Sequence, residues 1–80
     1  MPNALRHGAY RFYFFSRENS EPPHVHVKRD RQEAKFWLEP FVELAETWGF
    51  ASHELNRIRG LIEHYREILL ESWHDHFGEN

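Results

Sequence analysis

The segment His24-Val25-His26-Val27-Lys28-Arg29 alternates polar side chains with valine. Side chains along a strand point to the two faces of a sheet in turn, so this alternation predicts a half-buried strand. Its two valines then face an apolar core, and His24, His26 and Lys28 face away from it.

Further strands are predicted on both sides of this segment. Tyr10 to Phe15 is rich in the aromatic residues that favour strands, and Glu33 to Leu38 alternates again. Pro22-Pro23 holds the chain extended just before His24. A short further strand is predicted over Phe41 to Ala45. We therefore expect three or four antiparallel strands between about residues 8 and 46.

The second half of the chain predicts one long helix over about residues 53–77. Apolar residues recur there at three- and four-residue spacing, which is typical of an amphipathic helix. The stripe consists of Leu55, Ile58, Ile62, Tyr65, Leu69 and Trp73. Strands followed by a helix predict an α+β fold, in which an antiparallel sheet packs one long C-terminal helix on one face. We expect a single domain over residues 1–80, because a chain of this length forms one small core.

The composition excludes several classes of protein. The 80 residues are 40% apolar and 16% aromatic, which is too apolar for a disordered chain. The absence of cysteine excludes disulfide scaffolds and thiolate metal sites. The apolar runs are too short to cross a bilayer, and the first residues lack the apolar core of a signal peptide. We therefore expect a cytoplasmic protein that does not enter a membrane.

The net charge of -3 hides an asymmetry along the chain. Residues 1–38 hold seven basic and four acidic groups, whereas residues 39–80 hold three basic and nine acidic groups. Such a distribution is typical of two halves that attract each other within one molecule, and it also leaves a basic surface for RNA.

The alternation also predicts a group of polar side chains on the sheet face away from the helix. If the strands are neighbours, this face gathers three cations, two imidazoles and two aromatic rings. Its members are Arg11, Tyr13, His24, His26, Lys28, Lys35 and Trp37. A merely solvated face more often shows Thr, Ser, Glu and Lys, so this group is the candidate functional site. The inference depends on register, because a slip of one residue would exchange the two faces.

One interpretation of the histidine pair is acid–base catalysis on RNA. His24 and His26 would act as general base and general acid on a phosphate, and Lys35 would stabilise the developing charge. The remaining members of the group would bind the RNA through charge and through stacking on unpaired bases. These binding residues are Arg11, Tyr13, Lys28 and Trp37.

Two other interpretations stay open. The pair could bind a metal ion, with Glu21 or His74 completing the shell, but four ligands are hard to assemble without cysteine. We therefore expect no metal and no cofactor. Alternatively, the histidines are structural, and they hydrogen-bond to backbone groups or lie at an interface with a partner.

Several segments resemble a known family. They are Glu21-Pro22-Pro23-His24-Val25-His26-Val27, Glu33 to Pro40, Tyr10-Arg11-Phe12, Gly49-Phe50 and Trp73 to Gly78. On these segments the whole chain resembles small bacterial proteins of the "domain of unknown function 4160" family. Such proteins are typically encoded beside another small domain of unknown function. The resemblance therefore implies a two-gene, toxin–antitoxin-like module, and it supplies no established catalytic residue.

The sequence thus predicts a small cytoplasmic protein that binds a cognate small protein from the neighbouring gene. It would contact or cleave RNA through the histidine, lysine and tryptophan side chains of the sheet face. The alternatives are a non-catalytic interaction or regulatory module and a metal-dependent hydrolase, so enzymatic activity stays open. A thin core with many aromatic residues also predicts a homodimer or an obligate partner.

Overall fold

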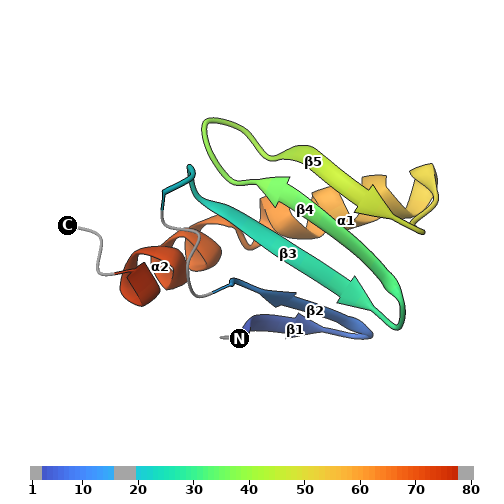
Figure 1. The fold of residues 1–80 in the computed structure, drawn as a ribbon, viewed down its shortest axis with the longest axis horizontal. Coiled ribbons are helices and arrows are strands. Elements are labelled where there is room, and N and C mark those ends of the chain that lie inside the picture. Colours follow the sequence, from blue (N-terminus) through green and yellow to red (C-terminus); the bar gives the residue numbers. More distant parts are fainter. Residues whose placement is uncertain (1–2, 16–19, 78–80) are drawn as a thin grey trace.

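A computed structural model of the chain describes residues 3–15 and 20–77. A five-stranded antiparallel sheet lies on two helices, and each strand pairs with the next one in the sequence (Figure 1). The strands are β1 (Asn3–His7), β2 (Tyr10–Tyr13), β3 (His24–Arg29), β4 (Gln32–Trp37) and β5 (Glu43–Trp48), and the helices are α1 (Ser52–His64) and α2 (Arg66–Phe77). The predicted α+β class and the antiparallel sheet are confirmed.

The predicted number of three or four strands is wrong, because the sheet has five. The strand that was not predicted is β1, which pairs with β2 so that His7 lies opposite Tyr10. Gly8 makes the turn between them at φ 59°, a conformation that favours glycine. The short strand predicted from residue 41 to residue 45 is β5, which extends to Trp48.

The predicted single helix is also wrong, because two helices meet at Tyr65. The backbone hydrogen bonds continue across this residue: its N–H donates to Leu61 O at 3.0 Å, and its carbonyl accepts from Leu69 N–H at 2.9 Å. Arg66 donates from Nε to Leu38 O at 2.8 Å, just after β4. This contact holds the start of α2 against the sheet at the point where the helix is interrupted. Within the two described ranges, neither helix is long and apolar enough to span a bilayer.

The core lies between the sheet and the helices. The apolar side chains with 0–1% exposure are Phe12, Phe14, Val25, Val27, Phe36, Leu38, Ile58, Ile62 and Leu69. The inward strand positions are those that the alternation predicted, since Val25, Val27 and Phe36 all belong to this set. In the predicted helix stripe, Leu55 and Tyr65 are only partly buried and pack against the core from its margin.

A buried polar cluster joins the start of α1 to the sheet. Glu54, which is 7% exposed, accepts a hydrogen bond of 2.7 Å from the hydroxyl of Tyr10 and pairs with Arg29. The Arg29 guanidinium also lies 5.7 Å from the ring centres of Tyr10 and Phe50. Burial raises the pKa of Tyr10, and its hydrogen bond to the Glu54 carboxylate raises this pKa further. The cluster fixes the helix layer to one face of the sheet and leaves the opposite face, here called the outer face, uncovered by helices.

Candidate functional site on the outer sheet face

Strand register brings the predicted site residues together on the outer face. Directly opposite residues of paired antiparallel strands point to the same side of a sheet. The register pairs Arg11 with Lys28, Tyr13 with His26, His26 with Lys35, and His24 with Trp37. The register therefore pairs these residues as the alternation predicted, but Tyr13 and His24 are buried.

Three cations form one row across β1, β2 and β3. Arg6 lies opposite Arg11, which lies opposite Lys28. Like charges directly opposite each other destabilise a sheet. Within residues 3–15 and 20–77, none of the three has an ion-pair partner, since the pairs formed there involve other cations. This row is called the cationic row below, and it ends beside Glu33 on β4, which lies opposite Lys28 in the register.

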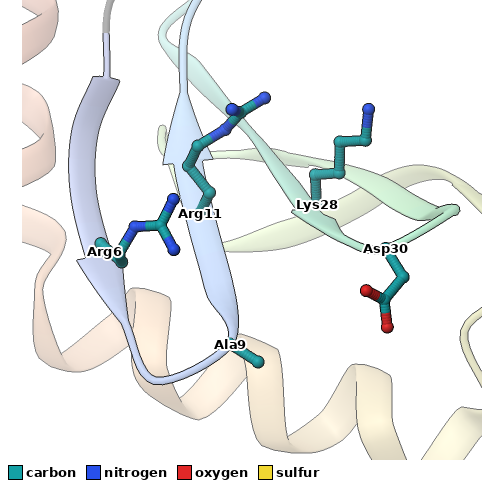
Figure 2. A pocket seen from close by; sticks show the side chains of 5 residues that line it. All are labelled: Arg6, Ala9, Arg11, Lys28 and Asp30. Carbon is teal, nitrogen blue, oxygen red and sulfur yellow. The ribbon is translucent and has the colours of Figure 1, made fainter.

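The cationic row lines a pocket of about 260 Å³, together with Ala9 and Asp30 (Figure 2). Asp30 follows β3 in the turn to β4, with φ 55°. The Nε atom of Arg11 is buried and has no hydrogen-bond partner in the part of the chain that the structure describes. Its guanidinium lies 5.1 Å from the ring centre of Tyr13, which supports the side chain from one side. The pocket is therefore lined mainly by cationic side chains.

His24, which was predicted to be catalytic and open to solvent, is completely buried at 0% exposure. Its Nδ1 donates a hydrogen bond of 2.9 Å to Pro22 O. Its ring centre lies 4.9 Å from that of Trp73 on α2 and 5.5 Å from that of Trp37. The imidazole is thus enclosed by aromatic rings from both layers at the end of the sheet. This environment favours the structural interpretation of His24 over contact with a dissolved phosphate.

His26, the second predicted catalytic residue, is half-buried among aromatic rings. Its ring stacks on Tyr13 at 5.4 Å, meets the edge of Phe15 at 4.5 Å and lies 5.2 Å from the ring of His24. Tyr13 was predicted to stack on bases, but it is only 2% exposed. Phe15 is 39% exposed and offers the accessible ring of this cluster.

Lys35 was predicted to stabilise charge during catalysis, but its own charge is already compensated. Its Nζ donates to Glu21 Oε1 at 2.7 Å and lies 4.6 Å from the ring centre of Trp37. The same Glu21 oxygen lies 3.9 Å from Nδ1 of His24. Lys35 and Glu21 therefore form a local pair beside the histidines, and Lys35 contributes less free positive charge than the cationic row does.

Carboxylates occupy the other side of the outer face. Glu46 on β5 lies opposite Lys35, and Glu43 lies opposite Trp37. The outer face therefore changes from cationic on β1–β3 to acidic on β5. A polyanion would be attracted to the first part and repelled by the second.

Three members of the pocket were not predicted as site residues, namely Arg6, Ala9 and Asp30. Arg6 was missed because its strand was missed; Gly8, which marks a tight turn between two short segments, is the signal that could have found it. Asp30 was treated only as part of a turn. Within the described ranges, no three His, Asp or Glu side chains are grouped so that they could hold a metal ion.

Comparisons with known proteins identify the family. No curated protein matches the chain, and no solved structure does. The family described as "Domain of unknown function (DUF4160)" matches residues 9–74, which is most of the chain. The matched stretch contains all seven predicted site residues, and it begins after Arg6. The resemblance noted in the sequence is thereby confirmed, and the chain belongs to the DUF4160 family.

Proposed function

We propose that this protein is a cytoplasmic subunit of a two-gene, toxin–antitoxin-like module that binds a cognate small protein and contacts RNA through its outer face. The observation that supports RNA contact is the cationic row, in which Arg6, Arg11 and Lys28 lie opposite one another and form no ion pair among the described residues. Phosphates of an RNA backbone would supply the missing negative charge.

The aromatic side chains of the same face fit single-stranded RNA. Phe15 is partly exposed, and its ring lies against His26 on the outer face. Unpaired bases stack on such rings, and each contact contributes about 1–3 kcal/mol. Bases would therefore lie towards Phe15 and His26 while the backbone follows the cationic row.

The geometry favours binding over cleavage. General acid–base catalysis requires both imidazoles to reach the atoms that exchange protons. His24 is fully buried, and its Nδ1 is occupied by Pro22 O. Lys35 is paired with Glu21. The predicted trio of His24, His26 and Lys35 therefore serves better as the support of a binding face than as a catalytic centre.

RNA binding is tested with a labelled single-stranded oligomer and fluorescence anisotropy at several salt concentrations. We expect affinity to fall steeply with salt, and Lys28→Ala to weaken binding and to reduce the salt slope by about one. Arg59→Ala is the matched control, because Arg59 is an exposed cation on α1. Binding that does not depend on salt, or an equal loss in both variants, would contradict the proposal.

The cognate protein is proposed to bind along β5. Trp48 at the end of this edge strand is 62% exposed, and Phe41, two residues before the strand begins, is 73% exposed. Large exposed apolar side chains at a sheet edge are typical of interaction surfaces. With Glu43 and Glu46 beside them, this edge fits a partner that presents basic and apolar residues.

Co-expression with the product of the neighbouring gene tests the partner surface. We expect the two proteins to co-purify and Trp48→Ala to release the partner, whereas Ile68→Ala, at a 50% exposed apolar position on α2, should keep it. Equal retention by the two variants would contradict the use of β5. Light scattering of the chain alone measures its molar mass, which distinguishes a monomer that awaits its partner from the predicted homodimer.

A further inference from the structure

We propose that the pocket between Arg6, Arg11, Lys28 and Asp30 binds a terminal phosphomonoester, the phosphate group at the end of an RNA strand or of a free nucleotide. This inference rests on the proposed RNA contact and assigns a chemical group to one part of that face. A pocket of this kind would distinguish the end of an RNA chain from its interior.

The first argument is charge. Three cations and one carboxylate line the pocket, so its formal charge is two positive. A phosphomonoester carries about -1.5 to -2 at pH 7, whereas an internal phosphodiester carries a single negative charge. The pocket therefore matches the terminal group better than the internal one.

The second argument is the arrangement of donors. Opposite residues on neighbouring strands have Cα atoms about 4.5–5.5 Å apart, so the three cations reach the pocket from three adjacent strands. Figure 2 shows the guanidinium of Arg6 extending towards Arg11. Guanidinium groups donate paired hydrogen bonds that fit phosphate oxygens.

The third argument concerns Asp30 and the size of the pocket. Its carboxylate points away from the Lys28 amine (Figure 2), so it can accept a hydrogen bond from a hydroxyl group of the sugar that carries the phosphate. Pockets for drug-sized ligands usually measure about 300–1,000 Å³. At about 260 Å³, this pocket fits a phosphate with its sugar and leaves the base outside.

The test compares short single-stranded RNAs that differ only at one end. A 3′-labelled oligomer is prepared with a 5′-phosphate or a 5′-hydroxyl, and a 5′-labelled oligomer with a 3′-phosphate or a 3′-hydroxyl. We expect the phosphate at one of the two ends to increase affinity about tenfold or more over the matching hydroxyl oligomer. Equal affinity for phosphate and hydroxyl at both ends overturns the inference, even where the oligomers themselves bind.

Two variants connect this preference to the pocket. Arg6→Ala removes an exposed side chain from an edge strand, and we expect it to bring the phosphate-to-hydroxyl affinity ratio close to one. Asp30→Asn keeps a residue that tolerates positive φ and removes the negative charge, so affinity for the phosphorylated oligomer should rise several-fold. Arg59→Ala should leave the ratio unchanged. A ratio that survives Arg6→Ala places the phosphate elsewhere and overturns the inference.

A free nucleoside monophosphate separates the two sources of the group. Displacement of the phosphorylated oligomer by low concentrations of the monophosphate assigns the pocket to nucleotides, and displacement only by phosphorylated oligomers assigns it to RNA ends. Binding of the monophosphate is measured as a rise in the melting temperature of the wild-type protein that Arg6→Ala abolishes. If the wild-type protein shows this rise but binds no hydroxyl oligomer, the result contradicts the proposed RNA contact and supports the phosphate pocket.

Discussion

Arg29 at the end of β3 and Glu54 in the first turn of α1 form an ion pair that joins the sheet to the helix layer. The side chain of Glu54 is 10% exposed and that of Arg29 is 30% exposed, so the carboxylate is the more deeply enclosed partner. Tyr10 donates a second bond to the same carboxylate, and Gln32 accepts from Arg29 on its other side. The helix layer is thus attached by polar contacts as well as by apolar packing.

Loss of this carboxylate should destabilise the fold. Glu54→Ala leaves Arg29 and the hydroxyl of Tyr10 without their acceptor, so we expect the free energy of unfolding to fall by about 2–3 kcal/mol. Arg29 keeps some contact with water, which limits the effect. Urea unfolding measures the change, and Glu63→Ala, at an exposed position of α1, is the control. Similar losses in the two variants would show that the pair contributes little.

Alkaline pH should weaken the same attachment. The pKa of Tyr10 is raised in the folded protein, chiefly by burial and then by the bond to Glu54, so the folded state holds the phenolic proton more tightly than the unfolded state. This contribution is complete below the unfolded pKa of about 10, and it is lost as pH rises through the higher folded value. We expect unfolding free energy to fall above about pH 10 less steeply in Tyr10→Phe than in the wild type. Parallel curves would contradict this assignment.

The core prediction concerns Ile62, which is fully buried on α1. Ile62→Ala should lower the free energy of unfolding by about 2–5 kcal/mol, because it removes packed atoms and leaves a cavity. Ile68→Ala, at a half-exposed position of α2, should change it by less than about 0.5 kcal/mol. Thermal melting followed by circular dichroism compares the two variants. Unchanged melting of Ile62→Ala would contradict the packing of α1 on the sheet.

The histidines provide a test of binding against catalysis. We expect RNA to remain intact with the purified protein from pH 5 to pH 8, with or without EDTA, because His24 is enclosed. His24→Ala should lower stability by removing a ring packed against Trp37 and Trp73. Gel analysis of labelled RNA measures cleavage. Cleavage that resists EDTA and disappears in His26→Ala would restore the acid–base interpretation.

Local alternation was sufficient to predict the centre of the sheet. Val25, Val27 and Phe36 face the core, and Lys28 and Lys35 lie on the other side, because a strand with one buried face has its register fixed by that face. The same reasoning could not show that His24 is enclosed, since the enclosing ring of Trp73 lies far away in the sequence.

The missed features depend on contacts between distant residues. The apolar stripe passes through Tyr65 without a break, and the interruption occurs where Arg66 binds Leu38 O. No local pattern connects Arg29 with Glu54, which are brought together only when α1 packs on the sheet. The strand containing Arg6 is short, and its pairing with β2 gives the pocket a cation that periodicity alone did not indicate.

The order of elements along the chain also determines which part of the fold is synthesised first. All five strands precede both helices, so the apolar side of the sheet, with Phe12 and Phe36, is synthesised before the residues that cover it. At about 5–20 residues per second, the segment Ser52–Phe77 takes roughly 1–5 s to synthesise. Until these residues have been made and have left the ribosome, the strands lack the helices that cover their apolar side, and a chaperone or a partner translated nearby would encounter that side first.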